Sequence, residues 1–201
     1  MATLCGAILA GGRGRRMAAD KTQMRRDGRR VLERTAALLA PLCGRVLLVA
    51  RDETQAAELS GVCALETIVD AQPGLGPIGG LHAALKHTGG DVLLVACDMP
   101  FLEAELLARL IETFRARSGQ VVAMRTLDEQ KQWRIEPLCA VWPQNILPQV
   151  EQAIAAQRLS MTRLAEELGA AFVDLSAAEA LQLRNINFPA ELQQPDARLE
   201  I

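Results

Sequence analysis

The stretch "ILAGGRGRRMAADK", residues 8–21, joins an apolar run to a loop rich in glycine and arginine. The run itself, residues 6–10, has the length and composition of a buried strand. A plain connector after such a strand needs only a turn, yet residues 11–30 hold eight basic and two acidic side chains in a chain whose net charge is −2. A positive field this concentrated suits a small polyanion better than a nucleic-acid duplex, because proteins that bind duplexes spread their basic residues over a face or a helix.

The chain has 201 residues, half of them hydrophobic, so we expect a single domain spanning residues 1–201 with a substantial core. No apolar run approaches the roughly 20 residues that span a bilayer, and no signal-peptide pattern opens the sequence. We therefore expect a cytoplasmic protein without membrane contact. The five cysteines are scattered singly, and most lie in apolar runs, which favours buried thiols over zinc ligands or disulfides.

Short apolar runs alternate with helix-like segments along most of the chain. We expect strands at residues 6–10, 45–50, 65–70, 92–97, 121–125, 138–142 and 171–175. Several are apolar throughout, as parallel strands buried on both faces are. Hydrophobic residues recur at helical spacing within residues 31–42 and 102–114, and residues 176–179 match a capping box. The alternation predicts the α/β class: a Rossmann-like, doubly wound, mostly parallel sheet with helices on both faces.

The glycine-rich stretch lies where ligands of open α/β sheets bind, beyond the carboxyl end of a strand. Gly11, Gly12 and Gly14 allow the backbone to point N–H groups at anionic oxygens, and Arg16 and Lys21 add full charges. The stretch fits neither the dinucleotide fingerprint nor the P-loop, since the glycine spacing and the Gly-Lys-Ser/Thr ending are absent. The residues alone favour a phosphate site, with a solvated basic loop as the alternative.

Two aspartates end neighbouring predicted strands. Asp70 is followed by four glycines within ten residues, and Asp98 is followed by Met-Pro-Phe. A triphosphate usually arrives with Mg²⁺, which takes one or two carboxylates and keeps several waters. Two carboxylates above a basic loop meet that need. The alternative is that each aspartate only caps a strand–helix turn, a position that aspartate favours.

The opening stretch also resembles a family signature. Its pattern is Leu9-Ala-Gly-Gly-x-x-x-Arg16-Met17-x-x-Asp20-Lys21, which is similar to the L-A-G-G-x-S-x-R-M-G-x-D-K of molybdenum cofactor guanylyltransferases. Two positions depart from that signature, since Gly14 replaces the common serine and Ala18 replaces the glycine after methionine. Neither change removes a charge.

Three further motifs follow in the order that this family has. Residues 70–80 resemble its D-x-x-P-G-x-G-P-L-x-G, residues 97–101 its C-D-M-P-F, and "RNINFPAEL" at 184–192 its R-N-I-N-T-P-E-D-L. Between them, "EPLCAVW" resembles H-P-L-x-A-V-Y, with Glu136 in the histidine position and Trp142 in the tyrosine position. After the second strand the family can place an asparagine near the nucleoside, where this chain has Arg51.

The resemblance implies a role for each matching residue. GTP would be bound by Leu9, Ala10, Gly11, Gly12, Lys21, Asp70 and Asp98. Arg16, Lys21 and Asp98 would be catalytic, with Asp98 also holding the metal. Gly80, Asn185 and Asn187 would lie on the pterin side. For the two asparagines, an Asx turn leading into Pro189 is the alternative.

By this resemblance the protein is a nucleotidyltransferase that moves GMP from GTP to the phosphate of molybdenum-bound molybdopterin and releases pyrophosphate, with Mg²⁺ as cofactor. GTP and molybdopterin are its expected substrates. Transient contacts with other cofactor-biosynthesis proteins and apo-molybdoenzymes are also expected, without nucleic acid as a partner. The alternatives are a related cytidylyltransferase or sugar-phosphate nucleotidyltransferase of the same fold, and a nucleotide- or cofactor-binding chaperone without catalysis.

Overall fold

A computed structural model describes most of the chain, and every structural statement concerns the residues it describes. These are residues 4–10, 24–61, 65–70, 72, 74–117, 119–185 and 199–200, with only the backbone for the last two. No helix in this part of the chain combines the length and apolar character that crossing a bilayer requires.

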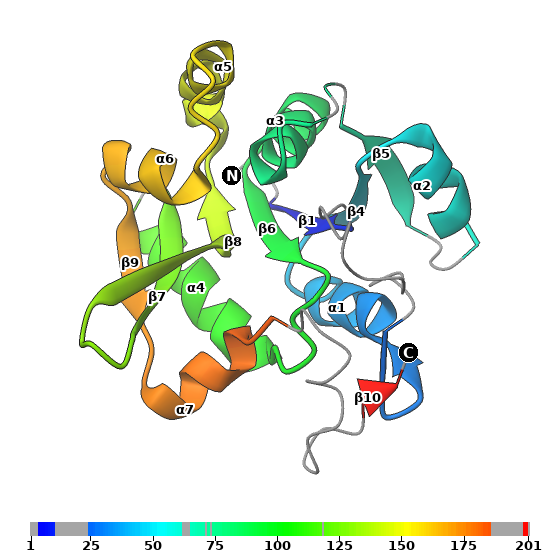
Figure 1. Ribbon diagram of the computed structural model, residues 1–201, viewed down its shortest axis with the longest axis horizontal. Helices are drawn as coiled ribbons and strands as arrows, with labels where there is room; N and C mark the ends of the chain where they lie inside the picture. Colours follow the sequence, from blue (N-terminus) through cyan, green and yellow to red (C-terminus); the bar gives the residue numbers. More distant parts are fainter. Residues whose placement is uncertain are drawn as a thin grey trace.

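A seven-stranded sheet organises the fold, in the order β5-β4-β1-β6-β8-β7-β9 (Figure 1). Its strands are β1 (Cys5–Leu9), β4 (Arg45–Ala50), β5 (Glu66–Val69), β6 (Val92–Ala96), β7 (Val122–Leu127), β8 (Trp133–Trp142) and β9 (Ala171–Asp174). All seven predicted strands are present. Strand β8 alone is antiparallel to its neighbours β6 and β7, so the predicted mostly parallel sheet is confirmed.

Strand β8 is twice as long as predicted. Its last four residues are buried, but its first half is half-buried or exposed and carries Arg134 and Glu136 among apolar residues. The sequence prediction recognised only the apolar half. The polar half pairs with β7 through a hairpin whose turn spans residues 128–132, where Lys131 has a φ of 58°.

Helices cover both faces of the sheet. They are α1 (Val31–Leu39), α2 (Glu53–Leu59), α3 (Pro77–Thr88), α4 (Ala104–Ala116), α5 (Leu147–Ala155), α6 (Met161–Glu167) and the short α7 (Ala177–Ala180), with 3₁₀ turns η2 (Gln144–Ile146) and η3 (Leu181–Leu183). The predicted capping box is confirmed: Ser176 accepts from the backbone of Glu179, whose carboxylate accepts from the N–H of Ser176 at 2.8 Å.

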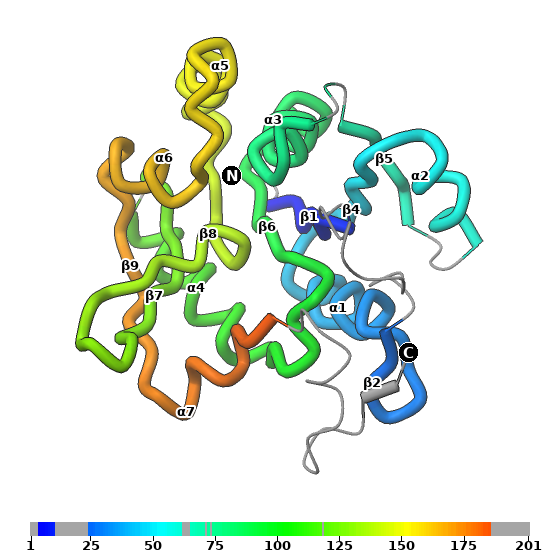
Figure 2. The backbone as a smooth tube through the Cα atoms, in the orientation of Figure 1, coloured from blue at the N-terminus to red at the C-terminus, as the bar shows by residue number. Residues whose placement is uncertain are grey.

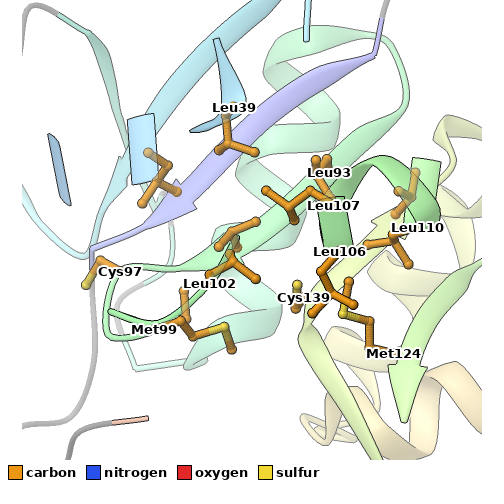
Figure 3. Packing of buried hydrophobic residues seen from close by; sticks show 14 of the residues in the cluster. Leu39, Leu93, Cys97, Met99, Leu102, Leu106, Leu107, Leu110, Met124 and Cys139 are labelled. Atoms are coloured by element: carbon orange, nitrogen blue, oxygen red, sulfur yellow. The ribbon is translucent and has the colours of Figure 1, made fainter. Parts of the chain in front are cut away.

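Two hydrophobic clusters pack on opposite faces of the sheet. Side chains alternate between them, so that Ile8 joins the cluster under α1 and α4 while Ala7 and Leu9 join the one under α3, α5 and α6. Figure 3 shows the first cluster, in which Leu106, Leu107 and Leu110 of α4 lie over the sheet. The prediction of helices on both faces is therefore confirmed.

A second, three-stranded sheet lies at the N-terminal end of α1. It consists of β10 (Leu199–Glu200), β2 (Arg25–Arg26) and β3 (Arg29–Arg30), and it brings the C-terminal end of the chain beside β2 (Figure 2). The β2–β3 hairpin turns at Asp27 and Gly28, both with positive φ, as the sequence pair Asp-Gly favours. This hairpin was not predicted, because the sequence analysis assigned these residues to the basic loop.

Candidate functional site

Leu9, Ala10, Asp70 and Asp98 lie at or just after the carboxyl ends of β1, β5 and β6, which with β4 are adjacent strands of the sheet. Three backbone hydrogen bonds hold these ends together: Cys97 N–H donates to Leu9 O at 3.1 Å, Ala10 N–H to Val49 O at 3.0 Å, and Asp70 N–H to Ala50 O at 3.0 Å. The chain therefore leaves β1 toward the glycine-rich stretch, β5 toward Asp70 and β6 toward Asp98 from one edge of the sheet.

Several predicted site residues lie outside the described residues. They are Gly11, Gly12, Arg16, Lys21 and Asn187, and their roles stay predictions. Both ends of the glycine-rich stretch are described. Ala10 is buried where β1 ends, and Met24 is buried where the chain resumes, its carbonyl accepting from the N–H of Val31 at 2.8 Å.

Asp70 is a buried carboxylate pressed against α3. It is only 9% exposed, and burial raises its pKa, an effect opposed by the hydrogen bond that Gln72 N–H donates to Oδ1 at 3.0 Å and by the charge of His82. A Cβ at Gly79 would lie 2.2 Å from Asp70 Oδ2. Gly79 thus provides the space that the carboxylate occupies.

Neither aspartate caps the helix that follows it. Helix α3 begins after Gly76, whose φ of 73° few other residues adopt, and Pro77 is its first residue. The residue before α4 is Glu103, five positions beyond Asp98. Neither aspartate is therefore the N-cap of the following helix, and Asp70 instead makes an Asx-type contact to Gln72.

Glu136 is a site residue that the sequence prediction did not include. Glu136 lies on β8, the antiparallel neighbour of β6, and the chain continues from β6 to Asp98. Burial raises the pKa of Glu136 to about 7, with the charge of Asp98 adding to the shift. The carboxyl groups of Glu136 and Asp98 are therefore close enough for their charges to interact. The sequence alone does not indicate this pair, because it depends on β8 lying beside β6 in the sheet.

Gln55 is a second residue that the prediction missed. Its side chain is 4% exposed and joins the ends of β1 and β4, because Nε2 donates to Ala10 O at 3.1 Å and Oε1 accepts from Arg51 N–H at 2.9 Å. The Arg51 side chain pairs with Asp52 at 2.7 Å, at the position where the resembling family can have an asparagine. The side-chain amide that links the ends of β1 and β4 thus comes from α2.

The two described residues predicted for the pterin side lie on different elements. Gly80 is buried on α3, where a Cβ would come 2.5 Å from Leu9 Cδ2, so close packing requires glycine there. Asn185 follows η3, and its Oδ1 is buried without a hydrogen-bond partner. A pterin contact for either residue stays a prediction.

Within the described residues, no three acidic, histidine or cysteine side chains come together as a metal-binding group. The oxygen-only pair of Asp98 and Glu136 fits a hard divalent cation, which needs few protein ligands and completes its shell with water and phosphate. Zinc, by contrast, prefers three or four nitrogen and sulfur ligands.

The sequence and the fold match known proteins over nearly the whole chain. The family described as "MobA-like NTP transferase domain" matches residues 6–171. Two curated relatives carry the name "Probable molybdenum cofactor guanylyltransferase". The one from Methanothermobacter thermautotrophicus is 32% identical over 192 residues, which is 93% of this chain and 96% of the relative. The one from Deinococcus radiodurans is 34% identical over 203 residues, 100% of this chain and 97% of the relative.

A solved structure agrees with these relatives. The crystal structure of molybdopterin-guanine dinucleotide biosynthesis protein A from Archaeoglobus fulgidus has a TM-score of 0.79 and 29% sequence identity, covering 94% of this chain and 95% of that one. The matched residues 6–171 include β1, β5 and β6, whose carboxyl ends form the site described above. The chain therefore belongs to the family of MobA-like NTP transferase domains.

Proposed function

We propose that this chain is a single nucleotidyltransferase domain that transfers GMP from GTP to the phosphate of molybdenum-bound molybdopterin and releases pyrophosphate. Curated relatives covering nearly the whole chain carry the corresponding name. The observation that carries the proposal is the hydrogen bond from Cys97 N–H to Leu9 O. It joins the end of β1, after which the glycine-rich stretch begins in the sequence, to the start of the Asp98 loop. A triphosphate held by the glycine-rich stretch would meet a carboxylate from the Asp98 loop.

The reaction needs charge neutralisation more than covalent help. An oxygen of the acceptor phosphate attacks the α-phosphorus in line, and the bond to pyrophosphate breaks. The acceptor is already ionised near neutral pH, since the second pKa of a phosphate monoester is about 6, so no general base is required. The backbone of residues 9–12 would hold the phosphates, Arg16 and Lys21 would balance their charge, and Asp70 would fix the nucleotide.

We propose Mg²⁺ as the divalent cation, with Asp98 as its protein ligand and Glu136 beside it. When bound, the cation supplies positive charge that polarises the α-phosphate for attack. Asp98 lies in a loop whose backbone is fixed to β1, so the carboxylate has a defined position relative to the glycine-rich stretch. The neighbouring carboxyl of Glu136 adds a second hard oxygen donor to the same place.

The pterin would bind on the side where Asn185 follows η3. The buried Oδ1 of Asn185 is an acceptor without a donor, and the amino and ring N–H groups of a pterin are donors. Together with Asn187 and the backbone at Gly80, it would read the edge of the heterocycle. We place the protein in the cytoplasm, in transient contact with cofactor-biosynthesis proteins and with the apo-molybdoenzymes that receive the product.

Pyrophosphate release by the purified chain tests the proposal, with Mg²⁺, molybdenum-bound molybdopterin and each of GTP, CTP, ATP and UTP. We expect release with GTP alone. Asp98→Ala and Lys21→Ala should lower the rate by about 10²–10³-fold, as removal of one charge-stabilising group does in other enzymes. The control Asp174→Asn changes an aspartate that pairs with Arg125 on the edge strand β9, and it should keep the wild-type rate.

Other outcomes identify the alternatives. Preference for CTP would keep the chemistry and assign the chain to a cytidylyltransferase. A sugar phosphate that replaces molybdopterin as acceptor would assign it to sugar-phosphate nucleotidyltransfer. Absence of release with every nucleotide, from folded protein supplied with Mg²⁺, would contradict catalysis and favour a binding protein. Wild-type turnover in Asp98→Ala would contradict the site assignment.

A further inference from the structure

The loop that carries Asp98 packs on the core through apolar side chains. It connects β6 to α4, and Cys97, Met99 and Leu102 are each less than 5% exposed. Figure 3 shows these three side chains among those of the cluster beneath the sheet. Apolar packing is non-directional, and the directional contact at the start of the loop is the bond from Cys97 N–H to Leu9 O.

A directional contact comes from Arg26, on strand β2 of the small hairpin. Its Nη1 donates to the carbonyl of Pro100 at 2.7 Å, and its guanidinium carbon lies 4.9 Å from the centroid of the Phe101 ring. The same nitrogen is 3.9 Å from Glu103 Oε1. A planar guanidinium can stack on the ring and donate to the carbonyl at once, which a lysine cannot do.

Arg34, on the first turns of α1, contacts the next part of the same loop. Its Nη2 pairs with Glu103 Oε1 at 2.6 Å and donates to Leu102 O at 3.4 Å. Arg26 and Arg34 together hold residues 100–103 from outside the core. We call these two side chains the arginine clamp.

The arginine clamp joins the Asp98 loop to the β2–β3 hairpin and to α1. Strand β2 begins two residues after the glycine-rich stretch of residues 11–23, and α1 follows the hairpin directly. A shift of this hairpin would therefore move the loop of Asp98. The clamp arginines are engaged with protein groups, which argues against a role for them in binding the triphosphate.

We propose that Arg26 and Arg34 are positioning residues that hold the Asp98 loop in its place at the end of β6, and that Arg26 does not bind the triphosphate. This inference rests on the proposed GMP transfer. It predicts that loss of the clamp misplaces Asp98 without removing any group that touches the substrate. The turnover number and the Mg²⁺ dependence should therefore change, while the KM for GTP should not.

The test compares Arg26→Gln with Arg29→Gln, which changes an exposed arginine on the other strand of the same hairpin. For Arg26→Gln we expect kcat to fall by about tenfold, within the up to about 10²-fold that a small misplacement can cost, with the KM for GTP within twofold of wild type. The Mg²⁺ concentration for half-maximal rate should rise several-fold. Arg26→Lys keeps the charge but not the stacking plane, so its kcat should be intermediate. Arg29→Gln should match the wild type.

Hydrogen–deuterium exchange of residues 98–103 gives a second readout that needs no turnover. Arg26→Gln should exchange faster there than the wild type and Arg29→Gln should not. If Arg26→Gln does not fold, Arg26→Lys and Glu103→Gln test the same contacts with milder changes. A wild type without pyrophosphate release would contradict the proposed function, while faster exchange in Arg26→Gln would still support the clamp.

Two results would overturn the inference. A higher KM for GTP with kcat unchanged would make Arg26 a triphosphate ligand. Unchanged kcat, Mg²⁺ dependence and exchange, with only a lower melting temperature, would reduce Arg26 to a structural role.

Discussion

Three carboxyl groups lie at the proposed site, and each is in a different environment. Asp98 is partly exposed in its loop, Asp70 is buried against α3, and Glu136 is half-buried and senses the charge of Asp98. Position in the sequence indicated the two aspartates, because each ends an apolar run. Glu136 could not be found this way, because its proximity to Asp98 depends on the antiparallel pairing of β8, which no local pattern encodes.

Glu136 should make stability depend on pH. Its pKa is raised from 4.5 to about 7 in the folded protein, so the native state binds a proton that the unfolded state has lost between these values. The free energy of unfolding should therefore fall as pH rises through that window, by at most about 3 kcal/mol. Glu136→Gln should remove this decrease, measured by denaturant unfolding at pH 4.5 and pH 8 in EDTA.

The matched control for this experiment is Glu129→Gln, an exposed glutamate in the β7–β8 turn. It should keep the wild-type pH dependence. An unchanged pH dependence in Glu136→Gln would show that the Glu136 carboxyl is not the group responsible.

Two adjacent glycines of α3 should respond differently to alanine. At Gly79 the added Cβ meets only the end of the Asp70 side chain, which can move, so stability should change by less than about 1 kcal/mol while the KM for GTP rises several-fold. At Gly80 the Cβ meets buried Leu9, and overpacking should cost about 1–3 kcal/mol. Thermal unfolding and GTP kinetics of both variants separate the effects. An unchanged KM in Gly79→Ala would contradict a role for Asp70 in nucleotide binding.

At the scale of elements, hydrophobic pattern predicted the seven strands of the main sheet and helices α1 and α4, because buried strands and amphipathic helices each repeat with their own period. The hairpin of β2 and β3 was missed, since two strands of two residues show no period and the Asp27-Gly28 turn lies among arginines. The charge of that segment suggested ligands, yet Arg26 serves the Asp98 loop.

The junction between the carboxyl ends of β1 and β4 depends on the side chain of Gln55 from α2. Gln55→Leu keeps the size of the side chain but leaves Ala10 O and Arg51 N–H without their partner, and burial of such groups should cost about 1–3 kcal/mol. Chemical denaturation measures this loss, and Glu58→Gln, exposed on the same helix, is the control. A loss below 0.5 kcal/mol, the usual range for neutral surface changes, would show that water replaces the Gln55 amide.

At the scale of the whole molecule, one sheet with a core on each face brings together residues that are distant in the sequence. Four separate segments of the chain contribute Ala10, Asp70, Asp98 and Glu136. The strand order β5-β4-β1-β6-β8 brings these segments together in one sheet. The order of the motifs along the chain indicated the family, and the matching relatives agree with it. Sequence alone could not supply the contacts between segments, which include the arginine clamp, the Gln55 bridge and the carboxyl pair.

The most direct measurement follows the α-phosphate of GTP. The purified chain is incubated with Mg²⁺, molybdenum-bound molybdopterin and GTP labelled with radioactive phosphorus at either the α- or the γ-position. GMP transfer predicts that the α-label appears in the pterin dinucleotide and the γ-label in pyrophosphate. An α-label that remains in GTP or appears as free GMP, or a γ-label on the pterin, would contradict GMP transfer as the activity of this protein.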